Sequence, residues 1–286
     1  MPDQIQVIEG GAGGPAPDPR TDVAHPARMY DYFLGGKDNF EVDREAADLA
    51  MSVVPDARRV ALTNREFLVR AVQLMALHKI DQFADLGTGF PTSPNVHEVA
   101  RARHPHARVV YVDNDPVVVT HSCALRKAKG VVAIDGDIRQ PDTILSNPEL
   151  VETIDLTRPV GMLFVAVLHF IPDLSRAAAI VTSFLSRMAP GSMLAISHIT
   201  SDNMPEAAMH TIQAAYADAT APVVFRSKAE IRALFAGLPL KSPGLVEVSR
   251  WRPELSTTRV KSTLRFLGGV AQVPEQWAAL APSAVA

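Results

Sequence analysis

Three aspartates follow consecutive short apolar segments of the chain. Asp85 ends the segment QFAD, Asp113 ends VVYVD, and Asp137 comes just after VVAID. They are 28 and 24 residues apart, which leaves room each time for one helix and one strand. Parallel strands joined in this way end at the same edge of a sheet, where open α/β sheets bind ligands. We therefore expect the three carboxylates to lie close together at that edge.

The regions around these aspartates alternate between strand and helix patterns. Strands are predicted near residues 81–85, 108–112, 130–134, 160–166 and 192–198, and helices near 94–103, 115–129, 141–154 and 174–189. Such alternation is typical of an α/β fold with a doubly wound, mostly parallel sheet. Two β-rich runs, at 241–251 and 262–270, predict an antiparallel terminal hairpin added to the edge of this sheet.

The sequence divides into four parts. Residues 1–24 contain the run GGAGGPAPDP, which predicts a flexible tail. Residues 25–79 predict a helical N-terminal cap, with one helix ending at Gly35 and Gly36, a second from Glu41 to Val54, and a third from about Ala57. Residues 80–275 form the predicted ligand-binding core, and 276–286 a C-terminal tail.

Composition narrows the class of protein. The net charge of −3 gives no general attraction to nucleic acids or anionic membranes. The single cysteine, Cys123, excludes an internal disulfide and any multi-cysteine zinc site, and favours a reducing cytoplasm. The longest apolar run, Val160 to Ile171, is shorter than the roughly 20 residues that cross a bilayer, so it predicts a buried central strand. We expect a cytoplasmic protein with no metal site and no membrane association.

A glycine turn follows the first aspartate. Gly87 and Gly89 allow a sharp turn and a close approach of a ligand to the backbone. Ser93 is a suitable helix cap, and Pro94 suits a first helical position. The third glycine of a dinucleotide fingerprint is absent. Asp85, directly before the turn, repels a pyrophosphate and attracts a cationic ligand such as S-adenosylmethionine, so the sequence favours this cofactor over a nicotinamide dinucleotide.

The other two aspartates suit the adenosine part of such a ligand. Asp113 is placed to accept hydrogen bonds from the ribose hydroxyls. Asp137 can accept from the adenine amino group, while the backbone amide of Ile138 donates to the ring. Each of these aspartates, taken alone, is equally typical of an exposed loop or cap. An aromatic side chain of the cap, such as Tyr30, can lie against the sulfonium or simply pack in the core.

The chain closely resembles a bacterial family of S-adenosylmethionine-dependent methyltransferases formerly catalogued as a domain of unknown function. The shared strings are RMYDYFLGGKDNFEVDREAA, NREF, QFADLGTGFPTSPNVHEVA, VVYVDNDPVV, VAVLHFIPD, MLAISHIT and PGLVEVSRWRP. The resemblance implies a Rossmann-like class I methyltransferase core with a bound S-adenosylmethionine. It implies that the cofactor's methionine end is lined by Asp85, Gly87 and Gly89, its ribose by Asp113, its base by Asn114, Asp137 and Ile138, and its sulfur by Ala166, Val167 and His169.

Two further residues are candidates for direct roles. His169 follows a predicted strand and is the candidate general base, although packing against the cofactor is the alternative role. Arg65 can bind the methionine carboxylate or form a surface ion pair.

The expected function is methyl transfer from S-adenosylmethionine to oxygen or nitrogen of a small molecule. A nucleic-acid acceptor is disfavoured by the lack of a basic stripe. A non-catalytic regulator that binds S-adenosylmethionine is the main alternative, and a nicotinamide-dependent oxidoreductase is a weaker one. The sequence names neither the acceptor nor the oligomeric state.

Overall fold

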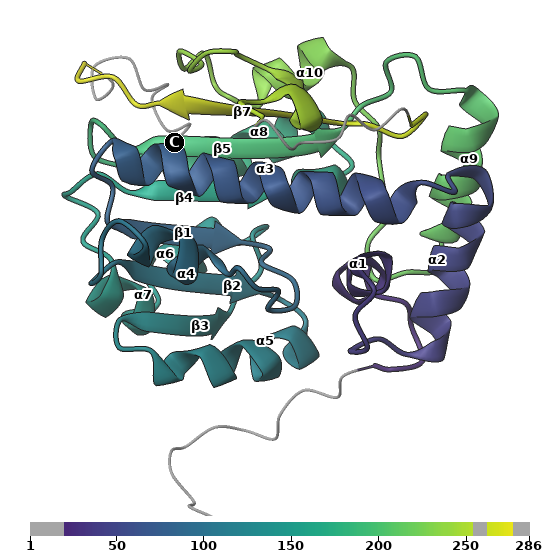
Figure 1. Cartoon of the computed structure of the whole chain (residues 1–286), viewed down its shortest axis with the longest axis horizontal. Helices are drawn as coiled ribbons and strands as arrows, with labels where there is room; N and C mark the ends of the chain where they lie inside the picture. The colour runs from purple at the N-terminus through teal and green to yellow at the C-terminus, as the bar shows by residue number, and fades with distance from the viewer. Residues whose placement is uncertain (1–19, 254–261, 277–286) are drawn as a thin grey trace, which may run out of the picture.

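The computed structural model describes residues 20–253 and 262–276. Most of the predicted N-terminal tail and all of the predicted C-terminal tail beyond residue 276 lie outside the described residues. Within the described part, a single sheet is flanked by helices on both faces, and three helices stand beyond one end of its strands (Figure 1).

The sheet has the strand order β3-β2-β1-β4-β5-β7-β6. Its strands are β1 (Gln82–Leu86), β2 (Arg108–Asp113), β3 (Val131–Asp135), β4 (Gly161–Val165), β5 (Met193–Ile199), β6 (Val246–Glu247) and β7 (Phe266–Gln272). The first five are parallel to one another, whereas β7 pairs antiparallel with both β5 and β6. The predicted doubly wound sheet with antiparallel terminal strands is therefore confirmed.

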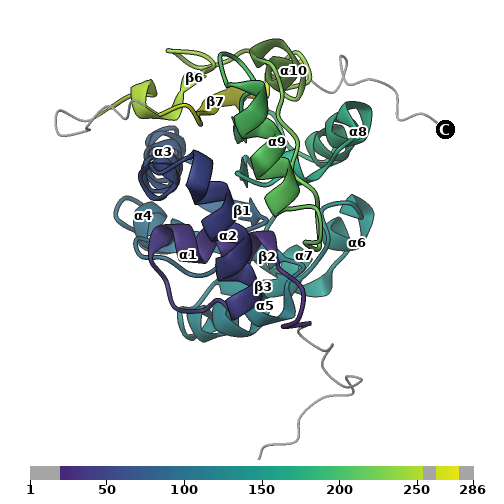
Figure 2. The same ribbon diagram turned by 90° about the vertical axis from the view of Figure 1, so that its right-hand side faces the viewer.

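Helices cover both faces of the sheet and its carboxyl edge. They are α1 (Pro26–Leu34), α2 (Glu41–Val53), α3 (Ala57–Leu77), α4 (Val96–Arg101), α5 (Pro116–Cys123), α6 (Pro141–Leu145), α7 (Pro148–Thr153), α8 (Leu174–Leu185), α9 (Glu206–Ala215) and α10 (Lys228–Ala233). Helix α3 packs on one face, and α6 and α8 pack on the other. Helices α1, α2 and α9 stand at the ends of the parallel strands, and Figure 2 looks onto them from that side.

Local signals in the sequence explain where the cap helices begin and end. Pro26 occupies the first turn of α1, and the imidazole of His25 caps it by accepting a hydrogen bond from the backbone N–H of Ala27. The helix ends at Gly35, whose φ of +83° is the left-handed conformation that glycine adopts without strain. Helix α3 buries a largely apolar face that also includes Asn64, which is 1% exposed.

Two local expectations were wrong, and one strand of the confirmed terminal hairpin is shorter than its sequence run. Helix α4 begins at Val96 rather than at Pro94, because Asn95 is its N-cap and its backbone N–H donates to the Glu98 carboxylate. The predicted helix over 141–154 is two helices, since Pro148 lacks an N–H to continue the first and starts the second, capped by Asn147. In the hairpin, β6 has only two residues, and β7 lies between it and β5.

The long apolar run is the centre of the fold, as predicted. It contains β4, which lies in the middle of the sheet, and then the turn Leu168–Phe170. Within the described residues, no helix is long and apolar enough to span a bilayer.

Candidate functional site

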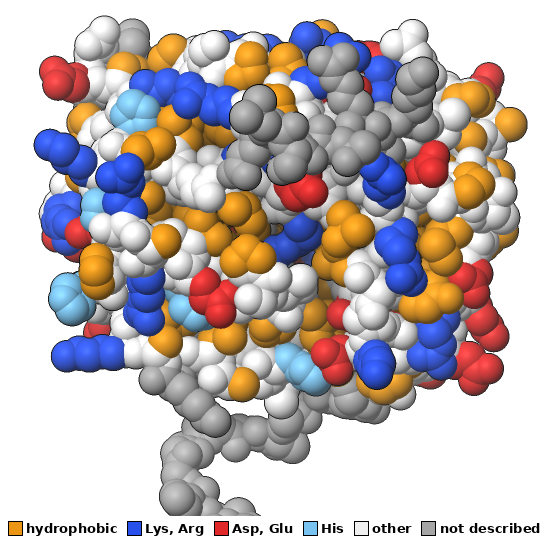
Figure 3. Space-filling model, viewed as in Figure 1, with side chains coloured by type: hydrophobic (Ala, Val, Ile, Leu, Met, Phe, Trp, Pro, Cys, Tyr) orange, Lys and Arg blue, Asp and Glu red, His pale blue; other side chains and the backbone are white. Residues whose placement is uncertain are grey.

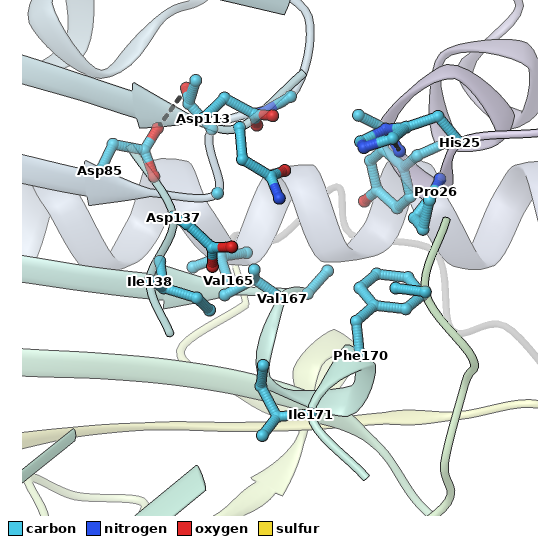
Figure 4. A pocket seen from close by; sticks show the side chains of 18 of the residues that line it. His25, Pro26, Asp85, Asp113, Asp137, Ile138, Val165, Val167, Phe170 and Ile171 are labelled. Carbon is cyan, nitrogen blue, oxygen red and sulfur yellow. Dashed lines mark hydrogen bonds between the residues drawn. The ribbon is translucent and has the colours of Figure 1, made fainter. Parts of the chain in front are cut away.

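A cavity opens at the carboxyl ends of the parallel strands, between the sheet and the cap (Figure 4). The strand ends supply its acidic side chains, and α1 and α3 close the opposite side. It lies where the chain order reverses, between β1 and β4, which is the position at which open α/β sheets bind ligands. All of the cofactor-binding candidates from the sequence line this one cavity: Tyr30, Arg65, Asp85, Gly87, Gly89, Asp113, Asn114, Asp137, Ile138, Ala166 and Val167.

The glycine turn after β1 forms one wall. Gly87 and Gly89 have φ values of +71° and +63°, and the backbone N–H groups of Gly87 and Thr88 donate to the carbonyl of Val112. The Thr88 hydroxyl donates to Asp85 over 3.0 Å. Asp85 is only 4% exposed, and this burial raises the pKa of its carboxyl to about 6 despite the nearby Arg65. The turn therefore holds a carboxylate whose negative charge has little solvent to stabilise it.

Asp113 ties the glycine turn to the end of β2. One carboxylate oxygen accepts from the backbone N–H of Gly89 over 2.8 Å, and the other accepts from that of Asp115 over 3.0 Å. Burial raises the pKa of Asp113 to about 6, although these backbone hydrogen bonds act in the opposite direction. Asp85 and Asp113 thus place two buried carboxyl groups in the wall of the cavity, and a bound cation would stabilise the charged form of both.

Asp137 was expected to be a free acceptor for the adenine amino group, but it forms an ion pair with Arg139. Burial alone would raise the pKa of its carboxyl, but hydrogen bonds from Arg139 outweigh burial and lower it. The guanidinium of Arg139 contacts both carboxylate oxygens, with an N–O distance of 2.5 Å in the ion pair. An adenine amino group would have to share these oxygens with Arg139, a residue that the sequence analysis missed although it stands only two positions later.

Tyr30 and Arg65 reach the cavity from the cap. The Tyr30 hydroxyl donates to the carbonyl of Ala61 over 3.1 Å and accepts from the Asn64 side-chain amide over 3.0 Å. Arg65 donates to the carbonyls of Thr92 and Pro94, at 2.7 and 3.1 Å. The guanidinium is therefore held beside the glycine turn rather than in a surface ion pair.

His169 does not line the cavity, which corrects the expectation that it stands beside the sulfur. The short turn Leu168–Phe170 carries its imidazole into the protein, 5.4 Å from the ring of His198 and 5.8 Å from that of Phe266. Burial, followed by the neighbouring His198 and Arg226, holds its pKa well below the usual value. Phe170 and Ile171 line the cavity at this point instead.

Arg226 holds the turn after β4 in place through hydrogen bonds to its backbone. Its guanidinium is 3% exposed and donates to the carbonyls of Leu168 and Ile171, at 3.0 and 2.6 Å. It also lies 2.8 Å from Nε2 of His198, whose Nδ1 lies 2.7 Å from the carbonyl of Ile199. Because a carbonyl only accepts, Nδ1 carries the proton and Nε2 accepts from Arg226. Sequence reasoning missed this network because its members are far apart along the chain.

A buried ion pair joins the cap to the sheet. Arg28 of α1 donates to both carboxylate oxygens of Asp115, at 2.7 and 3.0 Å, and the imidazole of His25 lies 3.3 Å from the same carboxylate. Burial lowers the pKa of His25 to about 4, so at neutral pH its imidazole is uncharged. The pair fixes His25 and Pro26 at the rim of the cavity, where Figure 4 shows them facing the aspartates.

The strand order, the antiparallel β7 between β5 and β6, and the acidic cavity at the switch point define a class I methyltransferase fold. Residues 15–274 match the S-adenosyl methyltransferase family, so the chain belongs to that family and is an S-adenosylmethionine-dependent methyltransferase. This cofactor also decides against the nicotinamide alternative.

Two solved structures are similar over nearly their whole length. One is a candidate methyltransferase from Thermobifida fusca YX, with 34% identity, a TM-score of 0.84, and coverage of 91% of this chain and 98% of the other. The second is a DUF574 family protein from Streptomyces avermitilis MA-4680, with 39% identity, a TM-score of 0.86, and coverage of 90% and 100%. No curated protein matches the chain.

Proposed function

We propose that the protein methylates an oxygen or nitrogen of a small molecule inside the capped cavity. The observation that carries this proposal is the cavity's enclosure: the strand ends form one side, and α1 and α3 close the other. On the face in Figure 3, acidic, basic and hydrophobic side chains are interspersed, an arrangement that favours a small molecule over a nucleic acid.

The residues lining the cavity suit S-adenosylmethionine. Asp85 and Asp113 are buried carboxylates whose raised pKa values reflect a lack of stabilising solvent, and a cationic ligand supplies the missing charge. We assign the glycine turn to the methionine end, Arg65 to its carboxylate, Asp113 to the ribose hydroxyls, and Ile138 to the base.

When bound, the cofactor supplies a methyl group on a sulfonium, and its transfer removes positive charge from the site. The protein's task is then to align the acceptor and exclude water. Phe170 and Tyr30 provide aromatic walls, and α1 covers the strand ends. His25 also lies at the rim of the cavity, where its imidazole is uncharged at neutral pH.

The test uses methyl-labelled S-adenosylmethionine and cell extract separated by size. The proposal expects label in the low-molecular-weight fraction when the extract is supplied with the protein. Label confined to nucleic acid or protein would contradict it.

Asp113→Ala should weaken binding of S-adenosylhomocysteine by about 1–3 kcal/mol, or roughly 5- to 150-fold, the cost of losing hydrogen bonds to a charged group. Isothermal titration calorimetry measures this directly. Asp135→Ala is the matched control, because Asp135 ends the neighbouring strand but is exposed and does not line the cavity. Equal affinities for the two variants would remove Asp113 from the ligand site.

Cofactor binding should weaken from about pH 7 to about pH 5. Asp85 and Asp113, each with a pKa of about 6, become protonated over this range and lose the charge that attracts the ligand. The dissociation constant should rise by up to about tenfold per pH unit for each group. The stability of the unliganded protein should change with pH in the opposite direction. A carboxyl group whose pKa is raised above 3.8 in the folded state stabilises the fold at pH values below 3.8, and this contribution is lost as the pH rises through about 6. Isothermal titration calorimetry across this pH range measures the affinity, and urea unfolding measures the stability. An affinity that does not change with pH would contradict the prediction for binding.

A further inference from the structure

One atom in the cavity wall lacks a hydrogen-bond partner. Asn64 lies on α3, lines the cavity and is 1% exposed. Its side-chain N–H donates to the Tyr30 hydroxyl, but its carbonyl oxygen, Oδ1, is buried without any partner within the described residues. A buried acceptor left unpaired costs about 1–3 kcal/mol, so its retention beside a cavity indicates a donor on the bound molecule.

The neighbouring charges indicate what kind of donor this is. Arg65, the next residue, lines a second, smaller pocket together with Asp85 and Thr88, and Asn64 itself contacts Tyr30, so these groups share one end of the cavity. That end offers a carboxylate, an unpaired carbonyl oxygen and a guanidinium already held by Thr92. Two acceptors beside one fixed cation match an α-amino acid, whose ammonium donates and whose carboxylate accepts.

We propose that Asn64 Oδ1, together with Asp85, binds the α-ammonium group at the methionine end of the cofactor. This rests on the proposed placement of that end at the glycine turn. Tyr30 has a positioning role, since its hydroxyl accepts from the Asn64 N–H and thereby leaves Oδ1 as the unpaired amide atom. The assignment gives the cap helix α3 a direct part in recognising the cofactor.

The test is a double-mutant cycle between the residue and the ligand. Wild-type protein and Asn64→Leu, a change of similar shape, are titrated with S-adenosylhomocysteine and with its analogue lacking the amino group. Asn64→Leu should weaken S-adenosylhomocysteine binding about 10-fold or more, the effect of a hydrogen bond to a charged group, and leave the analogue within about twofold. Unchanged binding of S-adenosylhomocysteine, or equal weakening of both ligands, would overturn the assignment.

Two further variants serve as controls for this test. Asn64→Asp keeps an oxygen for the ammonium and should retain the preference for the amino-bearing ligand; loss of that preference in the folded variant contradicts the proposal. Ser262→Ala removes another buried, unpaired side-chain oxygen, one that lines neither this cavity nor the pocket around Arg65, so both dissociation constants should match wild type. If Ser262→Ala reproduced the ligand-dependent loss, Asn64 would have no special role. Failure of the wild type to bind S-adenosylhomocysteine would instead reject the proposed function.

Discussion

Replacing Asp115 with alanine should lower the free energy of unfolding by about 3–5 kcal/mol, because it breaks a buried ion pair by removing one of its two charges. Asp115 is fully buried, and the guanidinium of Arg28 is 2% exposed. Their bidentate pair also joins α1 to the segment that follows β2. Urea unfolding followed by circular dichroism measures the loss.

The control for this change is an arginine–aspartate pair at the surface. Arg158 contacts Asp81 at 2.9 Å, but the two side chains are 51% and 39% exposed. Asp81→Ala should therefore cost no more than about 1 kcal/mol. If the two alanine variants unfolded at the same urea concentration, the pair between α1 and the sheet would not stabilise the fold as we infer.

Gly87→Ala should cost about 2–5 kcal/mol, combining two effects. A left-handed backbone costs an alanine about 1–2 kcal/mol, and Gly87 has a φ of +71°. The added Cβ would also stand 2.3 Å from Cγ2 of Val167, and such overpacking costs about 1–3 kcal/mol. Because Val167 lines the cavity, the variant should also bind S-adenosylhomocysteine more weakly.

Gly89→Ala separates these two effects. Its φ of +63° imposes a similar backbone cost, but its added Cβ would meet no atom within 4 Å. Gly89→Ala should therefore be the more stable variant by about 1–3 kcal/mol in thermal or urea unfolding. Equal stabilities would mean that Val167 moves aside at no cost, contrary to a close-packed turn.

The fold and much of the site could be predicted because they depend on order along the chain. Alternating strands and helices fix a parallel sheet, and a parallel sheet brings the ends of β1, β2 and β3 together wherever the side chains point. The grouping of Asp85, Asp113 and Asp137 in one cavity follows from topology alone.

Side-chain direction in irregular segments could not be predicted. His169 and Phe170 are adjacent in the turn after β4, and only the three-dimensional packing decides which of them faces the cavity. Contacts between distant residues were missed for a related reason. Arg28 with Asp115 and Arg226 with His198 are pairs whose members carry no sequence signal for one another.

The position of β7 also has a consequence for biosynthesis. All seven residues of β5 are buried, and their outer edge is hydrogen-bonded to β7, which comes after nearly all of the core. Until residues 266–272 have left the ribosome, β5 lacks the partner for this edge, and unpaired edges of this kind can recruit strands from other chains. Pairing with β7, the last strand within the described residues, therefore removes an edge at which the unfinished chain could associate.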